Sequence, residues 1–209
     1  MDKCDNIIIN VGRQIGSGGR IVAKMLADRF GCRFYDREIL NIAAKESGFS
    51  EVFFEQNDEH KNFFRSLFHI HSPFVSDSSF YKNDFSQESL FRFQSEAIRK
   101  AAKESSCVFV GRCADYVLRD YPNVFNVFIT ADMDDRIKAV ARRIGSTEEE
   151  ARKAIVNGES QRSNYYGFYT GKKWGHAESY DFCINTSRLG IEGTADALGE
   201  VITRSLNLK

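Results

Sequence analysis

Long apolar stretches are absent from this chain of 209 residues. No segment approaches the roughly 20 consecutive apolar residues that a membrane-spanning helix needs. The first residues, M-D-K-C-D-N, contain no apolar signal-peptide region, so we expect a cytoplasmic protein that does not bind membranes. The chain also lacks net charge, because 29 lysines and arginines balance 29 aspartates and glutamates. We therefore expect no nucleic-acid partner, and any anion site must be local.

Paired cysteines, histidine clusters and frequent prolines are also missing. The five cysteines form no C-x-x-C motif, which predicts reduced and mostly buried thiols. His60, His69 and His71 have no cysteine or acidic residue at a metal-ligand spacing, which favours exposed or capping histidines. Only two prolines and no repeat or low-complexity linker occur. The length and composition predict a single α/β domain with a sizeable core.

The most informative stretch runs from Ile7 to Met25, I-I-I-N-V-G-R-Q-I-G-S-G-G-R-I-V-A-K-M. A short β-branched run leads into a glycine loop that opens into a helical pattern. Glycines in the loop allow successive N–H groups to point into one concavity, and the helix N-terminus adds further donors. The stretch predicts a phosphate cradle, although a tight strand-to-helix connection would use similar residues. The glycines are Gly12, Gly16, Gly18 and Gly19.

The glycine loop departs from the common P-loop pattern G-x-x-x-x-G-K-[ST], in which the lysine and the hydroxyl bind phosphate and magnesium. Gly18 is followed by Gly19 and Arg20, so both side chains are missing. Arg20, or less favourably Arg13, is the candidate replacement for the lysine, because a guanidinium can bind phosphate oxygens with two donors.

Strand and helix patterns alternate along the rest of the chain. Two strand patterns within the first 45 residues flank a helix, which predicts a βαβ unit and a parallel sheet. About five strands are predicted in all. The predicted strands cover residues 7–11, 32–35, 107–110, 124–130 and 181–185. The predicted helices cover 20–30, 37–47, 86–103, 132–144, 147–162 and 191–206, with Asp36 capping the second and a capping box at 146–149 starting the fifth.

Eleven of the 18 phenylalanines fall in the segment from Phe49 to Phe93, within mostly polar sequence that has no strand pattern. We predict a helical insertion or lid there, with its aromatic side packed on the main domain or on a second copy of the chain. Core packing is favoured over a platform that stacks nucleotide bases.

Cationic residues occupy two further positions of interest. Gly111-Arg112 directly follows an apolar strand, and ligands of open α/β sheets bind beyond the carboxyl ends of strands. Arg112 is thus either a ligand-binding residue or an ordinary surface arginine. Basic residues also line the helices from Asp132 to Arg162 and lead into S-N-Y-Y-G-F-Y-T-G-K-K-W-G. Basic residues on a helix usually form a solvated face, but together with a segment rich in glycine, aromatic residues and lysine they are also typical of a mobile lid over phosphates.

Several motifs together resemble the cytidylate kinase-like proteins of the P-loop kinase superfamily. The motifs are G-R-Q-I-G-S-G-G-R, F-Y-D-R-E-I-L, V-G-R-C-A-D-Y-V-L, N-Y-Y-G-F-Y-T-G-K-K-W-G and Y-D-F-C-I-N-T-S-R-L-G, and they span nearly the whole chain. The resemblance implies an α/β, three-layer P-loop NTPase-type fold with a central parallel sheet. It divides the single domain into a core (about 1–48, 104–145 and 178–209), a helical acceptor-binding insertion (about 49–103) and a lid (about 146–177).

The resemblance also implies a reaction and the residues that serve it. The reaction is transfer of the terminal phosphoryl group of ATP to a nucleoside monophosphate, with CMP as the candidate acceptor and Mg²⁺ as cofactor. Donor phosphates would be held by Arg13, Gly16, Ser17, Gly18, Gly19 and Arg20. The acceptor would be held by Asp36, Arg37 and Arg112, and the cations around the transferring group would be Arg20, Arg112, Arg143 and Arg162.

Two departures from the family pattern leave alternatives open. Besides the missing lysine, Val110 stands where cytidylate kinases have an acidic residue, unless Asp115 substitutes for it; the metal ligands are therefore unassigned. The chain is then a divergent kinase, a nucleotide- or phosphate-binding regulatory protein without catalysis, or a kinase for a different acceptor.

Overall fold

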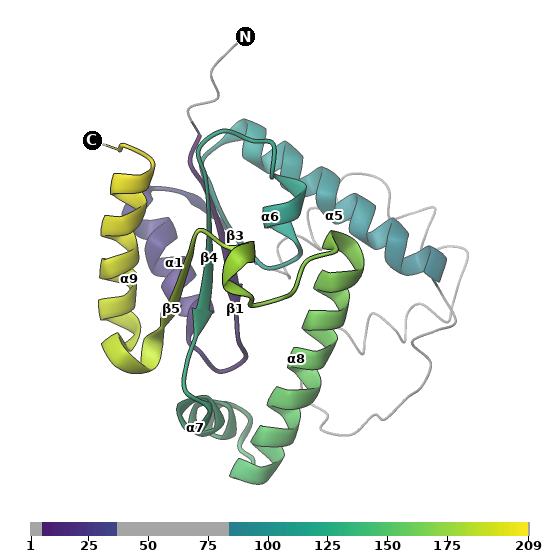
Figure 1. The fold of residues 1–209 in the computed structure, drawn as a ribbon, viewed down its shortest axis with the longest axis vertical. Helices are drawn as coiled ribbons and strands as arrows, with labels where there is room; N and C mark the ends of the chain where they lie inside the picture. The colour runs from purple at the N-terminus through teal and green to yellow at the C-terminus, as the bar shows by residue number, and fades with distance from the viewer. Residues whose placement is uncertain (1–5, 37–83, 209) are drawn as a thin grey trace.

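A computed structural model describes residues 6–36 and 84–208 (Figure 1). Its centre is a five-stranded sheet, in which every neighbouring pair is parallel and the order is β2-β3-β1-β4-β5. The strands are β1 (Ile8–Arg13), β2 (Arg33–Tyr35), β3 (Cys107–Val110), β4 (Val124–Thr130) and β5 (Phe182–Asn185). The predicted parallel sheet is confirmed. Because β1 lies between β3 and β4, the glycine loop leaves the middle of the sheet at its carboxyl edge.

Helices cover both faces of the sheet, which confirms the three-layer prediction (Figure 1). On one face, α1 and α9 pack against each other and onto the strands; on the other lie α5, α6 and α8. The helices are α1 (Gly19–Phe30), α5 (Asp84–Glu104), α6 (Ala114–Val117), α7 (Met133–Ile144), α8 (Glu148–Thr170) and α9 (Thr186–Ser205), and a short 3₁₀ helix covers Ala177–Ser179.

The alternation of side chains along β1 divides the core into two halves. Ile9 and Val11 join the cluster under α1 and α9, whereas Ile8 joins the cluster formed with Phe109 and Leu118. All five side chains are almost fully buried. Burial on both faces explains why β1 and β3 have nearly continuous apolar sequences. The strand β1, and with it the loop that follows, is thus fixed from both sides.

Three sequence predictions need correction. The helix expected to end near Arg162 continues to Thr170, so the first half of the segment predicted as a loop-like lid is helical. The closing helix begins at Thr186 and contains a break at Gly190. The capping box is made by Thr147 and Glu150, one residue later than predicted. The predicted helix 37–47, and the Phe-rich segment up to residue 83, lie outside the described residues.

The capping box at the start of α8 gives a stability prediction. Thr147 Oγ1 accepts a hydrogen bond from the Glu150 N–H at 3.3 Å, and Glu150 Oε2 accepts one from the Thr147 N–H at 2.9 Å. Thr147→Ala should therefore lower the free energy of unfolding by about 1 kcal/mol. Ser146→Ala is the matched control, and urea denaturation compares the two. Equal losses in the two variants would contradict the assignment of Thr147 as the cap.

The described cysteines carry free thiols, as predicted, although Cys183 is exposed. Burial raises the pKa of both Cys32 and Cys107 to about 11, which keeps these thiols protonated and unreactive at neutral pH. Within residues 6–36 and 84–208, no helix has the length and apolar character needed to span a bilayer.

Candidate functional site: a glycine loop with converging arginines

The loop between β1 and α1 has the backbone geometry of an anion site. Gly16 and Gly18 have φ values of 83° and 72°, in the left-handed region that glycine tolerates. Ser17 Oγ donates to the Gln14 carbonyl at 2.9 Å and so closes the turn. Gly18 precedes α1 without a side-chain cap, and the first turn of α1 contains no acidic residue. No side chain of the first turn therefore neutralises the positive end of the α1 dipole, which can bind an external anion.

The turn after β3 has an unusual backbone that displays Arg112. Gly111, Arg112 and Cys113 have successive φ values of 76°, 59° and 55°. Left-handed conformations are unfavourable for the two residues with side chains, and such strain is concentrated at functional sites. The Arg112 guanidinium lies over the ring of Tyr165 on α8, with its carbon 5.5 Å from the ring centroid. The turn and α8 thus fix this arginine at the carboxyl edge of the sheet.

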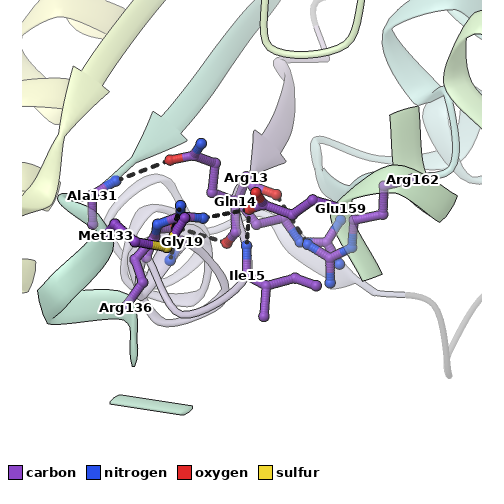
Figure 2. Close-up of polar contacts among 10 residues, drawn as sticks. Arg13, Gln14, Ile15, Gly19, Ala131, Met133, Arg136, Glu159 and Arg162 are labelled. Atoms are coloured by element: carbon purple, nitrogen blue, oxygen red, sulfur yellow. Dashed lines mark hydrogen bonds and ion pairs between the residues drawn. The ribbon is translucent and has the colours of Figure 1, made fainter. Parts of the chain in front are cut away.

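Helix α8 is fastened directly to the glycine loop (Figure 2). Glu159 accepts a hydrogen bond from the Ile15 N–H at 3.0 Å and forms an ion pair with the buried Arg136 of α7. One helical turn later, Arg162 donates to the Arg13 carbonyl at 3.0 Å. Two successive turns of α8 therefore hold the backbone of residues 13–15.

Arg162 sits among other positive charges. Its pKa falls to about 10, first because the guanidinium is buried and then because Arg112 and Arg143 repel the charge, while Glu159 opposes the shift. Like charges near one another favour a bound anion that neutralises them. Arg112 and Arg143 thus lie near enough to lower the pKa of Arg162, and these are three of the four cations that the resemblance implies around the transferring group.

The fourth of these cations, Arg20, has a different environment. Its Nε donates to Oδ2 of the buried Asp36 at 2.9 Å, and its guanidinium carbon lies 5.7 Å from the Phe34 ring centroid. The side chain is 65% exposed. Arg20 and Asp36, predicted for donor and acceptor respectively, thus form one ion pair at the end of β2, and Arg37 lies outside the described residues.

The residues described by the structure do not fit a protein-held magnesium ion. They include no cluster of three histidine, cysteine or acidic residues. The strand position before Gly111 is the buried Val110, and Asp115 accepts a hydrogen bond from the Tyr166 hydroxyl at 2.6 Å. The candidate substitution of Asp115 for the missing acidic residue therefore gains no support.

Asp115 instead gives a pH prediction. Burial raises the pKa of its carboxyl, with the Tyr166 hydrogen bond opposing. An acid whose pKa is raised on folding destabilises the native state as pH rises from its unfolded pKa, about 4, to its folded pKa. The stability of Asp115→Asn relative to the native chain, measured by urea denaturation, should thus increase as the pH rises above about 4. Asp120→Asn, at a highly exposed position, is the control; parallel pH profiles for Asp115→Asn and the native chain would contradict the prediction.

Sequence patterns missed two parts of this site. Arg136 was one of several residues on a basic helical face, yet its side chain is 4% exposed and pairs with Glu159. Its spacing on an amphipathic helix did not distinguish it from solvated neighbours. Gly158 was a usable signal, because a Cβ there would lie 2.5 Å from Ile15 Cδ1, which shows how closely α8 approaches the loop.

Comparisons with known proteins agree with this architecture. The family model of the cytidylate kinase-like family matches residues 8–188. The chain belongs to the cytidylate kinase-like family. A cytidylate kinase from Pyrococcus horikoshii is 29% identical over 191 residues, which cover 90% of this chain and 84% of the relative.

Two solved structures extend the comparison of this cytidylate kinase-like chain. An uncharacterised protein from Eubacterium ventriosum is 29% identical, with a TM-score of 0.73 and coverage of 95% of this chain and 99% of the other. A shikimate kinase from Bacteroides thetaiotaomicron is 14% identical, with a TM-score of 0.53 and coverage of 94% and 98%. At that identity the likeness concerns the fold alone, and it identifies the fold as the P-loop kinase type.

Proposed function

We propose that this member of the cytidylate kinase-like family transfers the terminal phosphoryl group of ATP to a nucleoside monophosphate, with CMP as the first candidate acceptor. The observation that carries the proposal is the glycine loop before an uncapped helix N-terminus, to which Arg162 is hydrogen-bonded through the Arg13 carbonyl while Arg112 and Arg143 lower the pKa of Arg162. Phosphoryl transfer asks a protein for positioning and for neutralisation of charge on phosphate oxygens, which this arrangement supplies. Membership of the cytidylate kinase-like family supports a nucleotide as the acceptor.

Each part of the site has a defined role in this proposal. Backbone N–H groups of Gly16 to Arg20 bind the donor phosphates. Arg112 lies at the end of β3, where it contacts the acceptor phosphate, and Arg162 contacts the transferring group from α8. Arg143 is exposed at the end of α7 and adds positive potential at the rim. Magnesium enters with the phosphates of ATP, since Mg²⁺ is commonly held by substrate phosphates and water.

The ion pair between Arg20 and Asp36 favours a second candidate, a nucleotide-binding regulatory protein without catalysis. Arg20 is the cation nearest in sequence to the missing lysine, and the ion pair keeps it at the end of β2. The sequence also predicts that two copies of the chain could associate through the Phe-rich segment. Such association is compatible with either function, and it remains a prediction.

The experiment that separates the two functions is a turnover assay with ATP, Mg²⁺ and a panel of nucleoside monophosphates. We expect one nucleoside diphosphate to form for each ADP released, with CMP among the best acceptors. Binding of ATP in calorimetry without turnover on any acceptor would instead support the regulatory protein. Turnover only on acceptors that are not nucleotides would retain the kinase and reject the nucleotide acceptor.

A further inference from the structure

We infer that Arg13, at the last position of β1, supplies the cation that the glycine loop lacks, and that Gly19 is a glycine because the Arg13 side chain lies against it. The inference rests on the phosphate site proposed above. In this inference the phosphate-binding cation is Arg13 at the end of β1, not Arg20 in the first turn of α1.

The Arg13 side chain fills the space beside the position of the missing lysine. A Cβ added at Gly19 would lie 2.6 Å from Arg13 Cβ and 3.1 Å from Arg13 Cγ. Contacts below 3.0 Å with a side chain's own Cβ cannot be relieved by rotating that side chain. A lysine at position 19 and an arginine at position 13 therefore exclude each other in this backbone.

The guanidinium of Arg13 reaches the turn after β3. A Cβ added at Gly111 would collide with Arg13 Nη1. The strands β1 and β3 are paired neighbours, and the Gly111 N–H donates to the Val11 carbonyl at 3.1 Å. The Arg13 head group thus extends along the carboxyl edge of the sheet toward Arg112, on the side where the α1 N-terminus receives an anion.

The backbone of Arg13 is held at the same time. Arg162 donates to its carbonyl at 3.0 Å, and the next residue but one, Ile15, is held by Glu159 (Figure 2). A guanidinium on a strand that is fixed in this way is preorganised, and it can bind two phosphate oxygens through parallel N–H donors. Arg20 donates its Nε–H to Asp36 at the end of β2.

A binding experiment tests the inference without an acceptor. Calorimetric titration with tripolyphosphate and with ATP compares the native chain with Arg13→Gln, Arg13→Lys and Arg20→Gln. We expect Arg13→Gln to weaken both probes about 10- to 100-fold, which is the range for losing hydrogen bonds to a charged group, and Arg13→Lys to recover part of the affinity. Arg33→Gln is the matched control, because Arg33 is an exposed arginine at the opposite edge of the sheet.

The outcomes separate this inference from the proposed function. Unchanged affinity in Arg13→Gln, or a larger loss in Arg20→Gln, would overturn the role of Arg13 while leaving the phosphate site in place. Binding of neither probe by the native chain would overturn both. Far-UV circular dichroism of each variant shows whether the fold persists, and Arg13→Lys provides the comparison if Arg13→Gln does not fold.

Steric coupling gives a second test that removes no charge. Gly19→Ala should weaken tripolyphosphate binding at least fivefold, because the added methyl group displaces Arg13. Gly193→Ala is the control, since its Cβ would meet only Leu189 Cβ at 3.4 Å. The double variant Arg13→Gly/Gly19→Lys should bind more tightly than Arg13→Gly, because the lysine then has room. Full affinity in Gly19→Ala would contradict the packing that we infer.

Discussion

Replacing Arg162 with glutamine should lower the rate of phosphoryl transfer about 10³-fold, equivalent to about 4 kcal/mol of transition-state stabilisation. Arg162 is half-buried, and it donates a hydrogen bond to the Arg13 carbonyl at the start of the glycine loop. Loss of solvent and the neighbouring arginines lower its pKa to about 10. Glutamine keeps a donor for that carbonyl but removes the charge. The measurement is kcat under saturating ATP and acceptor.

The control for this prediction lies on the same helix. Arg152 has 55% of its side chain exposed and pairs with Asp134, away from the loop. Arg152→Gln changes the net charge identically and should leave kcat within about twofold. A loss of similar size in both variants would show that Arg162 acts through the general charge of α8 rather than through contact with the transferring group.

Glu159→Ala should lower the free energy of unfolding by about 3 to 5 kcal/mol, the largest effect on stability that we expect. Glu159 is the ion-pair partner of Arg136, whose side chain is 4% exposed. Removal of one partner leaves a buried charge without compensation, which costs far more than the pair itself contributes. The Ile15 N–H also loses its acceptor. Urea denaturation of the two proteins measures the difference.

Two variants sharpen the test of Glu159. Glu149→Ala removes an exposed i,i+4 pair with Lys153 on the same helix and should cost less than about 0.5 kcal/mol. Arg136→Met/Glu159→Leu removes both buried charges and should recover much of the loss. A cost below 1 kcal/mol for Glu159→Ala, or no recovery in the double variant, would contradict a buried and mutually dependent pair.

The fold was largely predictable because its signals are local. Apolar runs mark β1, β3 and β4, and glycine follows α1 and α7 where the chain adopts a left-handed conformation. The parallel arrangement followed from strands separated by helices. Element ends were less predictable: α8 continues past Gly167 because Tyr165 and Tyr169 pack on Phe91 of α5, a tertiary contact that overrides the low helix propensity of glycine.

Sequence motifs single out candidate members of the site but not their pairings. The glycine loop and Arg112 stand out by their positions after strands, Arg162 follows from the family resemblance, and their roles in binding remain predictions. The pairing of Arg20 with Asp36, and of Arg136 with Glu159, depends on how α1 faces β2 and how α8 crosses the loop. Sequence spacing gives neither pairing: Arg20 and Asp36 were predicted to serve donor and acceptor separately, and Arg136 was one of several residues on a basic helical face.

The central claim is that the glycine loop and its arginines bind the phosphates of a nucleotide. Calorimetric titration of the native chain with ATP, and in parallel with adenosine, tests it most directly. We predict that ATP binds, that added salt weakens its binding because charge dominates the contact, and that adenosine binds at least 100-fold more weakly. Equal binding of ATP and adenosine, or no binding of ATP, would contradict the claim.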